Sequence, residues 1–200
     1  MADPIEFYFD FSSPYGYLAS ERVEGIGAEF GREVIWRPYL LGVAFKSTGQ
    51  SPLIAQPLRG PYHLHDLHRT ARRLKIPFVL PEGFPMPTQA AARAFYWLEG
   101  QSARTAKALA QAVYRAAFAG GRNIVARETV ADIAESIGLD RELVLEGIDT
   151  PTVKDRLRAE TDHALARGVF GSPFFFVGEE PFWGNDRLED VRDWLRTGGW

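Results

Sequence analysis

Cysteine is absent from this chain of 200 residues. Its absence excludes disulfide bonds, thiolate metal sites and any nucleophilic thiol supplied by the protein itself. Any thiol chemistry must therefore use a sulfur atom that a ligand brings.

The chain also lacks a long apolar run and any concentration of basic residues. No stretch reaches the roughly eighteen consecutive apolar residues of a membrane helix, and the start, MADPIEFYFDF, has no signal-peptide pattern. The 23 Lys and Arg residues are scattered among 26 Asp and Glu, for a formal net charge of −3, which argues against nucleic acid or an anionic membrane as partner. We therefore expect a cytoplasmic protein whose partner is a small molecule.

What is present suits a globular protein, since 46% of the residues are hydrophobic and 24% are charged. Residues 5–11, IEFYFDF, predict a strand buried on both faces. Residues 13–30 start with Ser-Pro and carry apolar residues at helical spacing, which predicts one amphipathic helix ending at Gly31. Residues 33–39 return to strand character, so the first forty residues predict a strand-helix-strand unit with parallel strands.

The middle of the chain, from about residue 41 to 150, shows helical periodicity and no convincing strand. We expect helices at about 62–74, 88–99, 103–119, 125–137 and 141–148, and a further helix at 153–166. A strand at 172–177, a second one starting at Phe182 and a helix at 186–196 close the chain. Periodicity thus gives the α/β class. Two β segments at each end would pair as one mixed sheet from residues 1–40 and 151–200 with an inserted helical domain at 41–150, an arrangement similar to that of thioredoxin-like proteins.

Ser13, Pro14, Tyr15 and Gly16 stand between the first strand and the next helix, where thioredoxin-like proteins carry C-x-x-C. A hydroxyl at the head of this motif can hydrogen-bond an incoming thiolate, and the helix N-terminus favours the negative charge. Glycine at the fourth position leaves no resolving thiol, which excludes disulfide exchange. The alternative is that Ser13 is a plain N-cap followed by proline, a common helix start, or that Ser12 is the functional hydroxyl. We prefer Ser13 because the reactive residue of such motifs directly precedes the x-x pair.

Two further motifs fit a thiol-containing peptide such as glutathione. Pro173 is a candidate cis-proline, and Ser172 before it offers backbone N–H and C=O groups to a bound peptide. An ordinary strand-opening proline is far commoner, and only the conjunction with Ser13-Pro14-Tyr15-Gly16 favours the cis form. Asn185 and Asp186 form a turn that can bind the α-amino group of a γ-glutamyl moiety while helix amides take its carboxylate. The alternative there is a capping box of Asp186 and Glu189.

Three segments, FYFDFSSPYGYLA, LLGVAFKSTGQSP and FGSPFFFVGEEPFWGNDRLE, resemble the 2-hydroxychromene-2-carboxylate isomerases and the related kappa-class glutathione transferases. The resemblance runs over essentially the whole chain and implies a DsbA-like fold, a homodimer and glutathione as cofactor. It implies that Ser13 holds and activates the glutathione sulfur, with Pro14 and Tyr15 as its neighbours. Gln50 takes a position that the transferases fill with asparagine, Ser172 one that they fill with an apolar residue, and Asn185-Asp186 matches their Ser-Asp.

The reaction that the resemblance implies is glutathione-dependent interconversion of 2-hydroxychromene-2-carboxylate and trans-o-hydroxybenzylidenepyruvate, a step of aromatic hydrocarbon catabolism. A small aromatic carboxylate needs a cation and an apolar wall, for which Lys46, Arg59 and Phe84 are candidates. A kappa-type glutathione transferase and a non-catalytic module that binds thiols or peptides stay open as alternatives.

His63, His65 and His68, together with Asp66, form the one cluster that suggests a metal site. His65 and His68 are three apart and share a helix face, but His63 lies on another side, so three ligands do not converge and we expect no metal. A Ser-His-Asp hydrolase is unsupported because the chain has no G-x-S-x-G motif.

Overall fold

A four-stranded mixed sheet lies at the centre of the computed structural model, which describes residues 3–200. The strands are β1 (Ile5–Phe9), β2 (Val34–Pro38), β3 (Phe174–Val177) and β4 (Glu180–Trp183), in the order β2-β1-β3-β4. β1 runs parallel to β2 and antiparallel to β3, and β3 pairs antiparallel with β4. The strand-helix-strand unit and the mixed sheet built from both ends of the chain are therefore confirmed.

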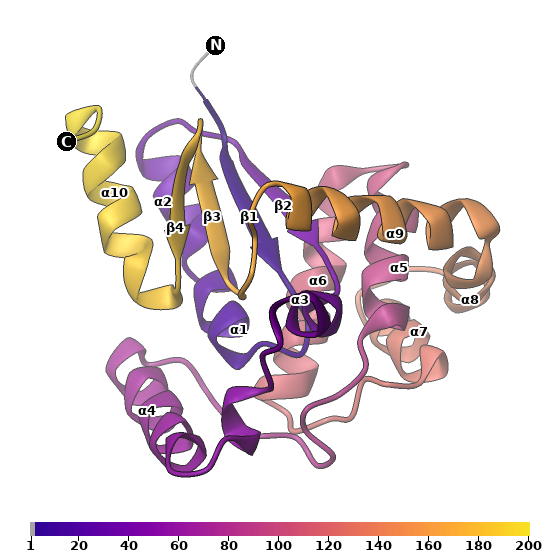
Figure 1. Cartoon of the computed structure of the whole chain (residues 1–200). Coiled ribbons are helices and arrows are strands. Elements are labelled where there is room, and N and C mark those ends of the chain that lie inside the picture. The colour runs from indigo at the N-terminus through magenta and orange to yellow at the C-terminus, as the bar shows by residue number, and fades with distance from the viewer. Residues whose placement is uncertain (1–2) are drawn as a thin grey trace.

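Helices cover both faces of this sheet (Figure 1). Ile5, Phe7 and Phe9 of β1 share one apolar cluster with α1 (Pro14–Ser20), α2 (Val23–Glu29) and α10 (Leu188–Thr197). On the other face Tyr8 packs with Phe174 and Phe176 of β3, under the end of α9 (Pro151–Ala166). Because β1 is buried on both sides, the loop that follows it starts from a fixed position.

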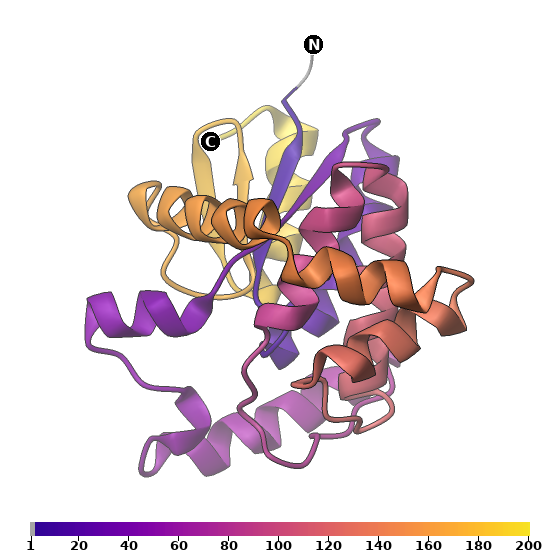
Figure 2. The same ribbon diagram turned by 90° about the vertical axis from the view of Figure 1, so that its right-hand side faces the viewer.

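The middle of the chain is helical, as predicted, and no strand lies within residues 41–150. Its elements are α3 (Leu41–Thr48), the 3-10 turn η1 (Leu53–Ala55), α4 (Arg59–Leu74), α5 (Gln89–Glu99), α6 (Ala103–Phe118), α7 (Arg127–Ser136) and α8 (Arg141–Asp149). Phe9 at the end of β1 packs on Phe95 of α5 and Tyr114 of α6, at ring-centroid distances of 6.2 and 5.6 Å. α4 is set apart from the sheet at the lower edge of the molecule in both views (Figures 1 and 2).

The structure corrects several predicted helix boundaries. The single helix predicted at 13–30 is two helices, because α1 ends at Ser20 and α2 starts at Val23. α3 occupies a segment for which no helix was predicted, and it buries only Ala44. α4 begins at Arg59 rather than 62, since glycine and proline are tolerated in its first turn. The last helix is preceded by a 3-10 turn, η2 (Asn185–Arg187). None of the helices in residues 3–200 is both long and apolar enough to cross a membrane.

Candidate active site

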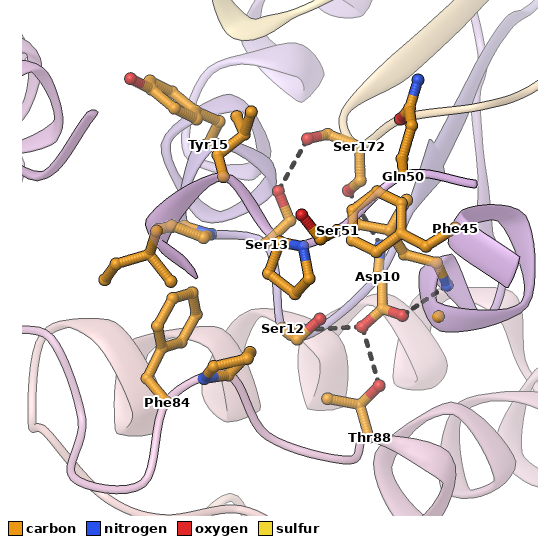
Figure 3. A pocket seen from close by; sticks show the side chains of 18 of the residues that line it. Asp10, Ser12, Ser13, Tyr15, Phe45, Gln50, Ser51, Phe84, Thr88 and Ser172 are labelled. Atoms are coloured by element: carbon orange, nitrogen blue, oxygen red, sulfur yellow. Dashed lines mark hydrogen bonds between the residues drawn. The ribbon is translucent and has the colours of Figure 1, made fainter. Parts of the chain in front are cut away.

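Ser13 is the N-cap of α1, and its hydroxyl group is committed on both sides. Ser13 Oγ accepts a hydrogen bond from the Gly16 N–H at 3.0 Å. It donates one to the Ser172 carbonyl oxygen at 2.7 Å (Figure 3). The residue is buried, with 5% of its surface exposed. The cap role and a functional role are therefore compatible, because capping uses an Oγ lone pair and leaves the hydroxyl proton for another acceptor.

Gly16, the fourth residue of the motif, has no space for a side chain. A Cβ atom there would lie 2.5 Å from the Tyr114 hydroxyl, 3.1 Å from Ser13 Cβ and 3.1 Å from Ser172 Oγ. The position that holds the resolving cysteine in a C-x-x-C motif is thus filled by side chains of α6 and of the Ser172 loop. The sequence argument against disulfide exchange therefore has a steric counterpart in the structure.

Asp10 lies beneath Ser13 and connects the segments that build the site. Its carboxylate accepts hydrogen bonds of 2.7 Å each from the Ser12 N–H, the Leu41 N–H and the Thr88 hydroxyl. Its backbone N–H donates to Ser172 Oγ at 3.0 Å. Burial raises the pKa of Asp10 above its usual value, and the hydrogen bonds from Ser12, Thr88 and Leu41 offset only part of this rise. Asp10 is therefore a positioning residue. An acidic residue at the end of a buried apolar strand, shortly before Ser13, is a sequence pattern that could have indicated this role.

The Ser172–Pro173 peptide bond is cis, as the sequence predicted. Pro173 is buried, and its carbonyl oxygen accepts a hydrogen bond from the Gly184 N–H at 3.0 Å, which ties this loop to the end of β4. Within residues 3–200, the Ser172 N–H donates to no backbone or side-chain acceptor. Ser172 therefore presents an unused N–H group next to the Ser13 hydroxyl.

An apolar cavity of about 620 Å³ opens on one side of Ser13. Phe45 and Phe84 line it, and they flank Ser13 from different sides in Figure 3. The structure also places Lys46, Gln50 and Arg59 in this lining, all three of them exposed side chains of the segment from α3 to the start of α4. Further apolar walls come from residues that the sequence analysis did not single out, namely Leu40, Leu41, Ile54, Met86 and Phe170.

A polar groove of about 700 Å³ adjoins the apolar cavity. Asn185, Asp186 and Pro173 line this groove, and Tyr15 and Ser172 line both spaces. Asn185 is buried, and its side-chain oxygen accepts a hydrogen bond from Arg22 at 3.4 Å, whereas the Asp186 side chain is 76% exposed. The structure thus brings all eight residues predicted for the thiol-peptide site to the two connected spaces around Ser13.

Tyr15 joins α1 to α4 across the boundary between the two spaces. Its hydroxyl donates to Asp66 Oδ2 at 2.6 Å, and Asp66 is also paired with Arg69. Burial and the hydrogen bond to Asp66 raise the pKa of the Tyr15 phenol, so the tyrosine stays protonated. Burial acts to raise the pKa of Asp66, but the hydrogen bonds from Tyr15 and Arg69 outweigh it and hold the pKa below its usual value.

Known proteins share the fold that positions this site. A family model described as the DSBA-like thioredoxin domain matches residues 4–196. The chain belongs to the DsbA-like thioredoxin family.

Within this family the chain is similar to isomerases and to kappa-class transferases. It is 30% identical over 198 residues to a 2-hydroxychromene-2-carboxylate isomerase of Sphingobium xenophagum, covering 98% of this chain and 99% of the relative. It is 26% identical to the glutathione S-transferase kappa 1 of Homo sapiens, covering 92% of this chain and 87% of that protein. A solved structure of a 2-hydroxychromene-2-carboxylate isomerase superposes with a TM-score of 0.85 at 28% identity, covering 96% of this chain and 94% of the other. These relatives support an enzyme of the isomerase type.

The histidine cluster of this DsbA-like chain does not assemble into a metal site within residues 3–200. His68 instead packs edge-on against Phe78, at a ring-centroid distance of 5.1 Å, and Asp66 is bonded to Tyr15. His63 lines both the apolar cavity and the polar groove. Of the four residues, His63 and Asp66 lie in the wall of the candidate site, a place that neither a metal site nor a polar helix surface predicts.

The arrangement as a whole can hold an anion next to an apolar cavity. The Ser13 hydroxyl and the Ser172 N–H are donors at the meeting point of the two spaces, and the chain has no cysteine thiol that could react there. A ligand in the polar groove can therefore reach over Ser13 and expose its reactive atom to a molecule in the apolar cavity.

Proposed function

We propose that this protein is a glutathione-dependent isomerase that interconverts 2-hydroxychromene-2-carboxylate and trans-o-hydroxybenzylidenepyruvate. The observation that carries the proposal is the buried Ser13 hydroxyl, which lies between a polar groove and an apolar cavity in a chain without cysteine. The isomerase relatives support the reaction, and the kappa-class relatives support glutathione as the source of the thiol.

The residues of the site fit glutathione as a chemical group. Ser172 offers an unused N–H and a carbonyl oxygen, the pair that a peptide backbone needs for a short antiparallel pairing. The polar groove carries charged side chains of both signs, including Asp186, to meet the ammonium and carboxylate groups of the tripeptide. Gly16 has no side chain, so the Tyr114 hydroxyl and the Ser172 side chain can pack directly beside Ser13 and hold this part of the site in place.

Ser13 changes its hydrogen-bond acceptor when the thiolate arrives. In the structure its proton goes to the Ser172 carbonyl oxygen, the same atom that a bound peptide N–H would use. With that carbonyl engaged by a bound peptide, the Ser13 hydroxyl would be free to donate to the sulfur and would hold the thiolate by a charge-assisted hydrogen bond. The Gly16 N–H keeps Ser13 Oγ in place during this rotation, because its bond uses a lone pair rather than the proton.

Bound glutathione would supply a thiolate for reversible addition to the conjugated double bond of the substrate. Opening of the hemiketal ring, rotation about the resulting single bond and elimination of the thiolate would then give the trans isomer, with no net redox change. The apolar cavity, with Phe45 and Phe84 in its lining, accommodates the aromatic ring. Lys46 and Arg59 are free to meet the substrate carboxylate, since neither forms an ion pair within the described chain. Their exposure leaves the carboxylate end of the substrate near the mouth of the cavity.

The experiment that tests this function measures glutathione binding and turnover on the purified protein. If glutathione binds only the folded site, a concentration of 100 times Kd adds about 2.7 kcal/mol to the free energy of unfolding, or roughly 5–10 °C in melting temperature for a chain of this size. Isomerisation of 2-hydroxychromene-2-carboxylate should then require glutathione. An unshifted melting curve at millimolar glutathione contradicts the proposal.

Two outcomes of the same experiment would favour the alternatives. Turnover of a generic electrophile such as chlorodinitrobenzene without isomerisation identifies a kappa-type transferase. Glutathione binding without turnover of either substrate identifies a module that binds thiols.

We also propose that the protein is a homodimer, from its resemblance to dimeric relatives. Sedimentation of a 22.4 kDa species at micromolar concentration would exclude a stable dimer.

A further inference from the structure

The polar groove has an excess of positive charge although the whole chain is acidic. Four arginines line it against three carboxylates, while the formal net charge of the chain is −3. The charged residues of the groove are Arg22, Arg69, Arg73, Arg187, Asp66, Asp186 and Glu189. An anionic group that enters the groove therefore meets a locally favourable potential.

Three of these four arginines already have a carboxylate partner. Arg22 lies 2.5 Å from Glu189, Arg69 is paired with Asp66, and Arg187 lies 2.9 Å from Asp190. Arg73 forms no ion pair and no side-chain hydrogen bond with any residue of the described chain, 3–200. Arg73 is thus the arginine of the groove that can take a ligand carboxylate without first giving up a protein partner.

Arg73 lies on α4, one turn after Arg69 and on the same helix face, opposite the η2 turn that carries Asp186. The charge of Arg73 acts on Arg22, which lines the same groove. Burial lowers the pKa of Arg22, and the cations Arg192 and Arg73 lower it further against the opposing effect of Glu189. Arg22 in turn donates to the side-chain oxygen of Asn185 at 3.4 Å, so Arg73, Arg22 and the turn of Asn185 belong to one groove.

We propose that Arg73 binds the α-carboxylate of the γ-glutamyl group of glutathione, while Asp186 across the groove binds the α-ammonium. The inference rests on the proposed function and names the recognition of its cofactor. A γ-glutamyl end carries one positive and one negative charge on the same carbon atom, so it requires one anion and one cation with free capacity. Asp186 has only a 3.7 Å contact to Arg187, and Arg73 has none, so the two residues supply that pair.

The first test compares Arg73→Ala with Arg72→Ala by calorimetric titration of glutathione. Arg72 is the matched control, because it is the neighbouring exposed arginine on the same helix and lines neither the cavity nor the groove. Arg73→Ala should raise the Kd of glutathione about tenfold, and Arg72→Ala should leave it within about twofold of the wild type. Melting temperatures without ligand should be the same in all three proteins, as expected for exposed sites.

The second test uses two glutathione analogues that each lack one charge. 4-Aminobutyryl-cysteinyl-glycine has no α-carboxylate and should bind wild type and Arg73→Ala equally. Glutaryl-cysteinyl-glycine has no α-ammonium and should still lose affinity in Arg73→Ala. An equal loss in Arg73→Ala for glutathione and for the aminobutyryl analogue would overturn the proposal, because Arg73 would then act on another part of the ligand.

The results separate this proposal from the proposed function. Wild-type protein that shows no glutathione binding overturns both. Wild-type binding with an unchanged Kd in Arg73→Ala overturns the role of Arg73 alone and leaves the α-carboxylate to backbone amides before α10.

Discussion

The two sides of the active site are built in different ways. On one side Asp10, Ser13 and Pro173 are buried at the ends of β1 and β3, and the polar atoms of Asp10 are engaged in hydrogen bonds. On the other side Lys46 and Gln50 belong to the segment from α3 to the start of α4, whose side chains are largely exposed. Both sides line the same apolar cavity.

In the proposed function, this difference separates the serine that holds the thiolate from the side chains that select the substrate. A buried network of satisfied hydrogen bonds holds Ser13 in one position, and breaking it exposes unpaired donors in a low-dielectric interior. The other side, called the exposed wall below, is the segment from α3 to the start of α4. Its side chains make few such hydrogen bonds, so they can change without a large effect on folding. Relatives of one fold can therefore keep the serine side and vary the wall, as expected where function is set by sites on a shared fold.

The first prediction would break the buried side. Asp10→Ala leaves the Ser12 N–H, the Leu41 N–H and the Thr88 hydroxyl without their acceptor. We expect the free energy of unfolding to fall by about 3–5 kcal/mol, measured by urea denaturation, because each unsatisfied buried donor costs about 1–3 kcal/mol and the network relaxes in part.

Asp162→Ala on the exposed surface of α9 is the control and should stay within about 0.5 kcal/mol of the wild type. A loss below about 1 kcal/mol for Asp10→Ala would mean that water or a rearranged loop satisfies the three donors. The two sides of the site would then differ less than the hydrogen bonds imply.

The second prediction concerns the hydroxyl that the buried side holds in place. Ser13→Ala should raise the pKa of the bound glutathione thiol by about one to two units, since a hydrogen bond to a charged group contributes roughly 1.5–3 kcal/mol. Turnover should fall by tens to hundreds of fold, whereas glutathione affinity should change much less. A pH titration of the thiolate absorbance of bound glutathione measures the shift.

Ser12→Ala is the matched control for Ser13→Ala and should leave the thiol pKa in place. If Ser13 serves only as the cap of α1, its replacement costs about 1 kcal/mol of folding stability and the thiol pKa does not move. That result would remove Ser13 from the mechanism and leave the buried side with a purely structural role.

The buried side is also the part of the site that the sequence predicted well. The apolar run of β1, the Ser-Pro start of α1 and the run FFFV of β3 are local patterns, and the sheet fixes where their ends meet. Asp10 was missed because its partners, Leu41 and Thr88, are distant in sequence and follow no periodic pattern. Hydrogen bonds of this kind depend on tertiary packing, which a single sequence does not display.

The exposed wall was predicted less completely. Lys46, Gln50 and Arg59 were predicted there, and Phe84 on the loop before α5, but α3 was not predicted as a helix. It has only eight residues, includes Gly42 and is followed by Gly49, so it is too short for helical periodicity to mark it. The break of the helix at residues 21–22 was also missed, since the apolar spacing continues from Leu18 to Val23 and Ile26 across it. The division into a thioredoxin-like domain and an inserted domain at 41–150 stays a prediction.

The third prediction sharpens the comparison from the exposed side and has the smallest expected effect. Lys46→Met removes a cation that has no carboxylate partner in the described chain, so the melting temperature should not change measurably. The KM for the aromatic carboxylate should rise about two- to fivefold, the range of an exposed charge pair, with little change in kcat or in the Kd of glutathione.

Lys154→Met, on α9 outside both spaces, is the control and should leave KM unchanged. Added salt should weaken substrate binding to the wild type more than to Lys46→Met, because exposed charges are screened. If Lys46→Met instead lowers the melting temperature by several degrees with KM unchanged, the wall is a structural element like the serine side, and substrate selection must lie deeper in the cavity, near Phe45 and Phe84.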